Sequence, residues 1–501
     1  MNELLNGLKE SDNVTFTTNG ATTYKSTMSK VYDLFAQGAA MRGASDDDCV
    51  RMFANAYFEN RELALKCLFW LRDIRGGAGE RRFFRVCYKW LARNYPREAS
   101  HLIPYIAEYG RYDDLFELFD TSIEAIMIGY IEDVITENKD HLVYKWMPSI
   151  NASSPETKER GRKFAKAFGL DERHYRKMLS EGRKACHLVE TLMSQNRWNE
   201  IEFQKLPSRA GILYSKAFAR REETAARYRE FMSNKDTTVH ASTLYPYDVV
   251  KKARDVMGHG YYNKNNVALD DTERLAANKY WDNLTDYFNG ASLDALCVCD
   301  TSGSMTSGYY SSIAPIDVAI SISLYCAERA KGPFANHFIS FSSRPQLIET
   351  TGIDFCDKVY QIYRRNLCEN TNIEATFDLI LNTALRRRLP QQELPKNLIV
   401  ISDMQFDDGS MWGYNPSTKS LMENIEAKWN HYGYKMPHLI YWNVNAASGG
   451  GNIPMREKDG VTFVSGASPS IFTSILTGKT GIDLMMETIN SERYAPITSI
   501  L

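Results

Sequence analysis

The spacing of the hydrophobic residues changes near residue 290, and this change constrains the fold more than any other feature of the chain. Before it, apolar residues recur at i, i+3, i+4 and i+7, which is typical of amphipathic helices. After it, short apolar runs alternate with helical segments, which is typical of an α/β domain with a mostly parallel sheet. The sequence therefore predicts a helical domain over residues 1–290 and an α/β domain over residues 291–501.

The helical part is predicted to be a series of helices joined by short polar or glycine-rich breaks. Ser45 followed by acidic residues at 46–48 is a good helix start, because the serine can cap the helix and the acids complement its dipole. Helices joined by tight turns favour stacked antiparallel pairs, although no fixed-period repeat is found. The helical segments are 29–41, 49–60, 61–74, 80–94, 99–110 and 123–135, followed by basic ones at 215–232 and 245–257.

The α/β part is predicted to place its functional residues at the carboxyl ends of its strands, where ligands bind in sheets of this kind. Polar residues that directly follow an apolar run are therefore the first candidates for a site. Strands are expected within 293–300, 336–343, 396–406, 438–445 and 461–466, and helices within 314–330, 371–388, 420–430 and 470–478.

Oxygen side chains follow the first predicted strand at alternate positions, as Asp300, Ser302 and Ser304. Thr371 lies at a helix entrance, and Asp403 lies just past another apolar strand. Hydroxyl and carboxylate oxygens with few negative charges suit a hard cation, which we expect to be Mg²⁺ or Mn²⁺. The alternative is that Asp-x-Ser-x-Ser is only a capped turn, since aspartate and serine are common turn residues.

Catalysis is not indicated. An aspartyl-phosphate phosphatase needs a second acid two residues after its first aspartate, and that position is Ser302. The chain has no H-E-x-x-H, no G-x-S-x-G and no phosphate loop of the Walker type, and no general base is evident near the predicted metal site. We therefore expect a binding protein and not an enzyme, with a metal-assisted hydrolase as a distant alternative.

A glycine-rich turn at 72–85, RDIRGGAGERRFFR, collects several arginines beside two phenylalanines. Backbone amides at a helix start together with arginines can bind phosphate, and arginines beside aromatic rings suit stacked bases. The alternative is a structural turn in which Asp73 and Glu80 form ion pairs with those arginines. The candidate RNA-binding residues are Arg72, Arg75, Arg81 and Arg82 of this turn, with Arg111, Lys145 and Arg209 elsewhere in loops or at helix starts.

The five predicted metal ligands resemble the metal-ion-dependent adhesion site (MIDAS) of von Willebrand factor A domains. In addition, HFISFSSRPQLIE, TNIEATFDLIL and VISDMQF in the second part, with LRDIRGGAGERRFFRVCYKWL and IAEYGRYDDLFEL in the first, resemble the Ro ribonucleoprotein autoantigen and a related Ro-like family of unknown function. This resemblance implies a TROVE-type ring or solenoid of HEAT-like helix pairs followed by an A domain. It also implies binding of single-stranded RNA ends in the ring and of small structured RNAs outside it, with a divalent cation held directly or through water.

The net charge of −2 gives no bulk electrostatic attraction for nucleic acid, so RNA binding would have to be local. The nine cysteines are irregularly spaced, which argues against a disulfide framework; Cys297 and Cys299 are expected on one face of a strand as core thiols. No apolar run is long enough to span a membrane and the start has no signal region, so we expect a soluble cytoplasmic protein.

The function predicted from these features is an RNA-binding or ribonucleoprotein scaffold with a divalent-metal adhesion site. The alternative is a protein-interaction module in which the metal captures an Asp or Glu of a protein partner, without RNA.

Overall fold

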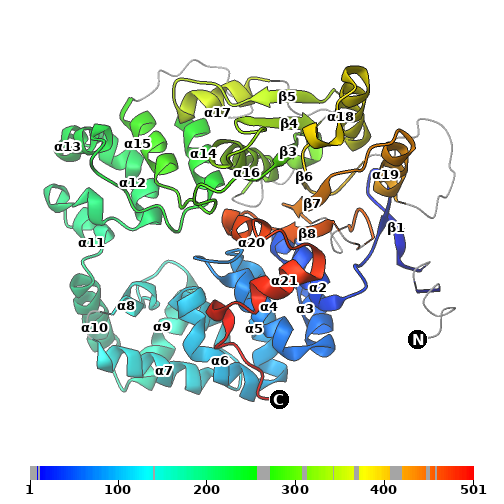
Figure 1. Ribbon diagram of the computed structural model, residues 1–501. Helices are drawn as coiled ribbons and strands as arrows, with labels where there is room; N and C mark the ends of the chain where they lie inside the picture. The colour runs from blue at the N-terminus through cyan, green and yellow to red at the C-terminus, as the bar shows by residue number, and fades with distance from the viewer. Residues whose placement is uncertain are drawn as a thin grey trace.

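The computed structural model describes residues 8–9, 12–138, 141–256, 271–306, 313–341, 344–365, 372–406, 420–446, 452–456, 458 and 460–501. Within these ranges the predicted fold class is confirmed: a long all-helical region precedes a domain built on one mostly parallel sheet. Figure 1 shows the helices following one another in an arc, from the blue helices at the bottom, through the cyan ones, to the green ones that reach the sheet.

The helical region begins with helices that agree closely with the predicted segments. Ser45 caps the second of them as expected, because its Oγ accepts a hydrogen bond of 3.1 Å from the backbone N of Asp48. The helices of this first group are α2 (Lys30–Gln37), α3 (Asp46–Glu59), α4 (Arg61–Arg72), α5 (Arg81–Asn94), α6 (Pro96–Tyr109), the 3₁₀ segment η2 (Tyr112–Leu118) and α7 (Glu124–Glu137).

The rest of the arc is more loosely patterned in sequence. The basic segment 215–232 is helical as predicted, except that Arg221 is extended and separates two helices that pack against each other. The Arg221 guanidinium lies 4.4 Å from the Trp198 ring centroid. The helices are α8 (Val143–Trp146), α9 (Pro155–Ala167), α10 (Glu172–Ala185), α11 (Val189–Ser194), α12 (Ser208–Arg220), α13 (Glu222–Ser233), α14 (Pro246–Val256) and α15 (Asp271–Asp282).

The sheet has six strands in the order β5-β4-β3-β6-β7-β8, and only the pair β4 and β5 is antiparallel. β3 is central and is hydrogen-bonded to β4 on one side and to β6 on the other, with Cys299 opposite both Ser340 and Ile401. The edge strand β5 was not expected from the sequence. The strands are β3 (Ala295–Asp300), β4 (His337–Phe341), β5 (Gln346–Glu349), β6 (Asn397–Ser402), β7 (His438–Asn443) and β8 (Val461–Ser465).

Helices of the α/β part pack against the sheet. α16 packs on β3, β4 and β6, and the buried thiols of Cys297 and Cys299 both face it, toward Cys326 and Ser323. This agrees with the expected placement of the two thiols on one face. The eight described cysteines are free, and Cys368 lies outside the described residues. The helices are α16 (Pro315–Arg329), α17 (Phe355–Tyr363), α18 (Ile373–Arg387), α19 (Leu421–His431), α20 (Phe472–Ile475) and α21 (Gly481–Ile489).

The N-terminal segment packs against the α/β part, and a helix near the other end of the chain packs against the helical part. The sequence did not indicate either contact. An N-terminal hairpin of β1 (Val14–Phe16) and β2 (Thr22–Tyr24) joins the α/β part, where Tyr24 forms a bridge with Ile453. α2 covers β8, and the backbone N of Phe463 donates a 3.0 Å hydrogen bond to the Tyr32 hydroxyl. At the other end, α21 packs on α4.

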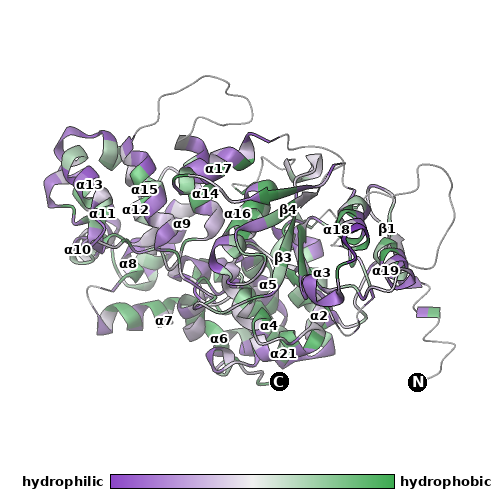
Figure 2. Cartoon of the chain, turned by 45° about the horizontal axis from the view of Figure 1, so that its top comes forward, coloured by the Kyte–Doolittle hydropathy of each residue, from purple (hydrophilic) through white to green (hydrophobic). Residues whose placement is uncertain are grey.

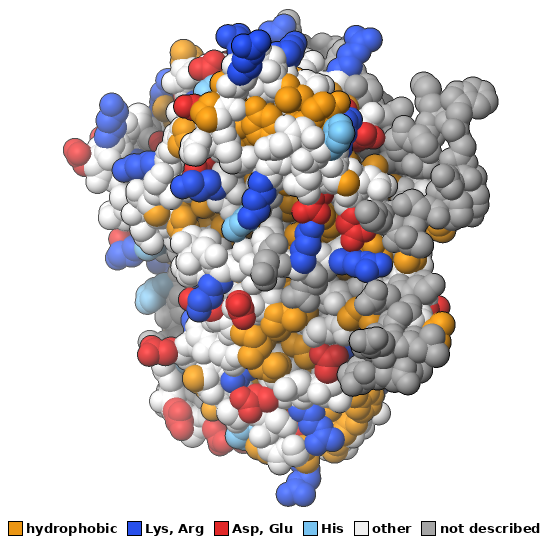
Figure 3. Space-filling view, turned by 45° about the vertical axis from the view of Figure 1, so that its right-hand side comes forward, with side chains coloured by type: hydrophobic (Ala, Val, Ile, Leu, Met, Phe, Trp, Pro, Cys, Tyr) orange, Lys and Arg blue, Asp and Glu red, His pale blue; other side chains and the backbone are white. Residues whose placement is uncertain are grey.

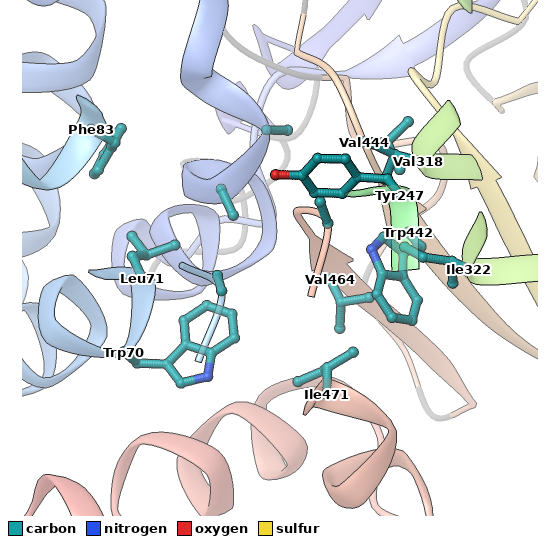
Figure 4. Packing of buried hydrophobic residues seen from close by; sticks show 14 of the residues in the cluster. Trp70, Leu71, Phe83, Tyr247, Val318, Ile322, Trp442, Val444, Val464 and Ile471 are labelled. Atoms are coloured by element: carbon teal, nitrogen blue, oxygen red, sulfur yellow. The ribbon is translucent and has the colours of Figure 1, made fainter. Parts of the chain in front are cut away.

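One hydrophobic core therefore runs through both parts. The close view in Figure 4 places Trp70 of α4 in the same cluster as Trp442 of β7 and Val464 of β8. Phe35 of α2 stacks on Trp70 with ring centroids 4.5 Å apart, which ties the first helices to the side of the sheet.

The hydropathy pattern follows this architecture. In Figure 2 the strands β3 and β4 of the sheet are largely hydrophobic, whereas many helices carry one hydrophobic and one hydrophilic face, as expected for helices that cover a core. In the described part of the chain, no helix combines the length and the apolar character that crossing a membrane requires.

Candidate functional site

The connections of the sheet change direction between the neighbouring strands β3 and β6. The chain passes from β3 through α16 to β4 on one side, and from β6 through α19 to β7 on the other. Neighbouring strands whose connections leave in opposite directions leave a gap at their carboxyl ends, and ligands of α/β proteins bind there. Asp300 ends β3 and Asp403 directly follows β6, so both lie at this point.

Asp300 is fully buried and held by hydrogen bonds to both carboxylate oxygens. The backbone N of Ser302 donates to Oδ1 at 2.9 Å, and the hydroxyl of Ser402 donates to Oδ2 at 2.5 Å. Ser402 was not predicted. The register of β3 and β6 would have suggested it, because Cys299 pairs with Ile401 and the following residues are then neighbours.

The remaining described members of the predicted site connect Asp300 to Asp403. Ser302 Oγ lies 3.1 Å from Ser304 Oγ, and the Ser304 hydroxyl is hydrogen-bonded to the Asp403 carboxylate. The structure thus brings four of the five predicted ligands together, and we call Asp300, Ser302, Ser304 and Asp403 the candidate metal site. Thr371 lies outside the described residues.

The two carboxylates of the candidate metal site disfavour each other's charged form. Burial and the nearby Asp403 carboxylate together raise the pKa of Asp300 to about 7, against the opposing effect of the hydrogen bonds from Ser402 and Ser302. Burial also raises the pKa of Asp403. Two buried acids beside each other are costly without a positive charge, and a divalent cation would favour their ionised form.

The donor set fits a hard cation better than a transition metal with nitrogen or sulfur ligands. It offers two carboxylates and two hydroxyls, and Mg²⁺ in proteins is commonly held by one or two carboxylates while keeping several waters. Within the described ranges, no group of three or more His, Cys, Asp or Glu side chains is placed to hold a metal. A cation at this site would therefore depend on hydroxyls, water and ligands from outside.

The second predicted site, on the helical part, is assembled from three separate segments. Arg81 begins α5, Arg111 precedes η2, and Arg209 lies in the first turn of α12. Burial lowers the pKa of the Arg111 guanidinium, the nearby positive charges of Arg72, Arg81 and Arg209 add to this lowering, and Asp113 opposes it. Arg81 and Arg209 are therefore both close enough to Arg111 to repel it.

An aromatic ring lies beside Arg111. The Arg111 guanidinium lies 5.1 Å from the ring centroid of Trp146, and the Lys145 Nζ lies 5.8 Å from it. We call Arg81, Arg111 and Arg209, with Trp146, the arginine surface. Trp146 was not predicted as part of a site, since a lone tryptophan in a short helix carries no distinctive sequence signal.

The arginines differ in how strongly acidic residues hold them. Arg81 has only a long contact of 3.9 Å with Asp113, and its side chain is 52% exposed. The side chain of Arg209 is 47% exposed and pairs with Asp248 at 2.8 Å. Lys145 pairs with Glu190 at 3.2 Å. An acidic residue thus holds Arg81 less closely than it holds Arg209 or Lys145.

Arg72 does not lie on a surface. It is buried and forms an ion pair with buried Asp114, with 2.7 Å between Nη2 and Oδ2. Arg85 binds the other carboxylate oxygen of Asp114 at 2.6 Å. Breaking a buried pair of this kind leaves an uncompensated charge, so Arg72 acts here as a structural residue and we leave it out of the arginine surface.

Arg75 and Arg82 belong to other contacts. Arg75 is exposed, and its guanidinium donates to the backbone O of Glu108 at the end of α6. Arg82 pairs with Asp46 at the start of α3, with 2.5 Å between Nη2 and Oδ1. The structure does not bring these two side chains into the arginine surface.

The glycine-rich turn itself is a junction between distant segments. Buried Asp73 accepts hydrogen bonds from Arg493 and, at 2.9 Å, from the Tyr494 hydroxyl, so it holds the end of the chain. Gly79 has φ +70°, and a Cβ there would lie 1.6 Å from the Tyr245 hydroxyl oxygen. Asp73 therefore has a structural role in this turn, as the alternative interpretation expected. Its partners, however, are Arg493 and Tyr494 from the far end of the sequence and not the arginines of the turn.

Positive and negative side chains lie close to one another on the molecular surface. Figure 3 shows one face, over the middle of which Lys and Arg side chains alternate with Asp and Glu. With a net charge of −2 for the whole chain, any attraction for an anion has to come from a local group such as the arginine surface.

Comparison with known proteins gives family membership and no established activity. A model of a domain of unknown function, DUF7788, matches residues 294–495, and one of DUF2828 matches residues 17–136 and 141–291. An uncharacterized protein, L728, of Acanthamoeba polyphaga mimivirus is 25% identical over 532 residues, which cover 98% of this chain and 87% of that protein. The crystal structure of the Deinococcus radiodurans RO (RSR) protein is similar at 13% identity and a TM-score of 0.34, over 93% of this chain and 100% of that one. Because the DUF2828 model spans more than half of the residues, this chain belongs to the DUF2828 family.

Proposed function

We propose that this protein binds RNA through the arginine surface of its helical part and holds a divalent cation at the candidate metal site. The role is one of binding and scaffolding and not of catalysis. The observation that carries the RNA proposal is the convergence of Arg81, Arg111 and Arg209 from three separate segments beside an aromatic ring.

Arg81 and Arg209 have acidic partners in Asp113 and Asp248, but their positive charges still disfavour the charged form of Arg111, and an added anion would favour it. A phosphate backbone supplies that charge through short charge-assisted hydrogen bonds. Trp146 offers a face on which a base can stack, and stacking tolerates any base sequence. Single-stranded RNA has phosphates and unpaired bases side by side, which makes it the ligand that suits this surface best.

The test is a salt series with short single-stranded RNA. Because each neutralised phosphate releases counterions, log affinity against log salt falls by about 0.7 per contact on a single strand. A variant that combines Arg81→Gln, Arg111→Gln and Arg209→Gln should flatten this slope by about 2. An unchanged slope would show that this surface does not contact the phosphates.

A matched control uses arginines on other helices of the same part. Arg162 of α9 and Arg173 and Arg176 of α10 are exposed. Replacing these three by glutamine removes the same total charge, so it separates a local site from a general effect of net charge. The control variant should bind RNA with nearly the slope of the unchanged protein.

A second candidate function uses the metal without RNA. A cation bound by two carboxylates and two hydroxyls stays electrophilic and can accept an acidic side chain from a protein partner. The pair of buried acids, Asp300 and Asp403, favours this possibility. Under this alternative, chelation or Asp300→Asn would abolish binding of the partner, and the protein would have no affinity for RNA at physiological salt.

A further inference from the structure

The N-terminal hairpin β1–β2 lies directly against the segment that follows Asp403. The Thr17 hydroxyl donates to the backbone O of Phe406 at 2.7 Å. The backbone N of Thr18 donates to Gln405 Oε1 at 2.9 Å, and Asn19 Nδ2 donates to the backbone O of Gln405 at 2.7 Å. Three consecutive residues of the hairpin turn thus bind two residues that lie 386 to 389 positions away in the chain.

Gln405 connects the hairpin to the candidate metal site through a backbone hydrogen bond. While the hairpin holds its side chain and its carbonyl, the backbone N of Gln405 donates a 3.1 Å hydrogen bond to Asp403 Oδ1. Gln405 and Asp403 are both buried. A displacement of the hairpin would therefore move the donor that orients the Asp403 carboxylate.

The backbone between these two residues needs such support. Met404 has φ +60°, a left-handed conformation that is unfavourable for a residue with a side chain, and it is buried. A conformation of this kind persists where the surroundings impose it. The hairpin bonds on one side, and the 3.0 Å bond from Met404 N to the Ser402 hydroxyl on the other, are the restraints that surround it.

The hairpin turn is itself well held. Gly20 takes φ +90° in the turn, and the backbone N of Ala21 donates a 3.0 Å hydrogen bond to the Thr17 hydroxyl. A separate anchor lies further along, where the Thr23 hydroxyl donates to the backbone O of Ile453 at 2.8 Å. The hairpin is therefore fixed to the α/β part independently of its contact with residues 403–406.

We infer that the N-terminal hairpin is a positioning element of the candidate metal site, in which Thr17, Thr18 and Asn19 hold Gln405 and Phe406 so that the Asp403 carboxylate faces the cation. This inference rests on the proposed metal function. It means that the affinity of the α/β part for metal depends on a segment that precedes the entire helical part.

The test measures Mn²⁺ affinity by isothermal titration of the full chain. The double variant Thr17→Val, Asn19→Ala removes two of the three hairpin bonds and should bind Mn²⁺ about tenfold more weakly, as is usual when groups that orient metal ligands are removed. Asn19→Ala alone leaves the hydrogen bonds of the turn in place and should weaken binding about threefold. Circular dichroism checks that both variants remain folded.

Thr23→Val is the matched control. It makes the same chemical change as Thr17→Val in the same hairpin, but it removes the bond to Ile453 and leaves the bonds to residues 405 and 406. Its Mn²⁺ affinity should stay within about twofold of that of the unchanged protein. An equal loss in this control would mean that hairpin stability, and not the contact with residues 405 and 406, is what matters, which would overturn the inference.

A second measurement works without metal. Hydrogen–deuterium exchange of the metal-free protein should become at least about fivefold faster in peptides covering residues 403–406 of the double variant, while peptides from β7 stay unchanged. If the unchanged protein binds no Mn²⁺, the metal proposal fails and the inference fails with it. If it binds Mn²⁺ and the double variant binds equally well, or if exchange at 403–406 is unaltered, the inference alone is overturned.

Discussion

The candidate metal site and the arginine surface are built in opposite ways. The described donors of the metal site lie at or just after the ends of two adjacent strands, and all of them except Ser304 are buried. The arginine surface takes its cations from three separate segments, and two of them are about half exposed. The first is a largely buried group of oxygen side chains, and the second is a partly exposed surface whose charges salt can screen.

This difference teaches what each site is suited to bind. Buried oxygens held by hydrogen bonds can be specific for a small, hard cation, because their geometry is fixed before it arrives. Exposed arginines near an aromatic ring suit a long, flexible polyanion, whose phosphates can adapt to them. The two sites should therefore respond differently to mutation, pH and ionic strength.

The largest expected effect is the loss of Mn²⁺ affinity when Asp300 is replaced. Asp300→Asn keeps the shape of the side chain but removes a buried charge, and it should lower Mn²⁺ affinity at least about 100-fold. Titration calorimetry measures this. Asp294→Asn, just before the other end of β3, is the control and should bind as the unchanged protein does. Equal binding by Asp300→Asn would break the assignment of the site.

The next largest expected effect is the loss of RNA affinity when the arginine surface is altered. The combined replacement of Arg81, Arg111 and Arg209 by glutamine should weaken binding of single-stranded RNA about 30-fold at low salt, because hydrogen bonds between charged groups are lost. Fluorescence anisotropy with a labelled oligonucleotide measures it. Mn²⁺ affinity of the same variant should not change; a parallel loss would show that the two sites are not independent.

A smaller effect is expected from pH. Because the folded protein raises the pKa of Asp300 to about 7, this carboxyl is mostly ionised at pH 8 and mostly protonated at pH 6. A metal must displace the proton, so Mn²⁺ affinity should fall about tenfold from pH 8 to pH 6. In the metal-free protein the sign is opposite, since a raised carboxyl pKa contributes stability that is lost as the pH rises through 7. A flat affinity profile would contradict the burial of Asp300.

The smallest expected effect is that of metal chelation on RNA affinity, which tests whether the two sites act independently. Chelating the divalent metal should change RNA affinity by less than about twofold, because the arginine surface needs no cation to bind phosphate. Anisotropy titrations with and without EDTA, at matched ionic strength, measure this. A large loss on chelation would favour the alternative in which the metal site is the binding surface.

Much of the fold was predictable, because local patterns carry it. The change of hydrophobic period near residue 290 predicts a helical part and an α/β part, and the Ser45 cap was correctly located. The hairpin β1–β2 was not predicted, since two strands of three residues have too short a pattern to recognise. Neither was the edge strand β5, which has only four residues.

The candidate metal site was predictable in part for a related reason. Asp300 and Asp403 each follow an apolar strand, and parallel strands bring their carboxyl ends to one edge. Arg72 shows the limit of the same reasoning at the other site: it looks like a surface cation in the glycine-rich turn, yet it is buried against Asp114. Sequence reveals that an arginine is charged but not whether a carboxylate from a distant segment already neutralises it.

By itself, then, the sequence determined the periodicity, the strand ends and the residue types that can bind metal, because these depend on neighbours within a few positions. The tertiary structure decided which distant residues meet. It joined Arg81, Arg111 and Arg209 at one surface, bound Asp73 to Arg493, and laid Thr17 and Asn19 on Gln405 and Phe406. The physical reason is that such contacts arise from the packing of one shared core, whose geometry depends on all of its elements at once.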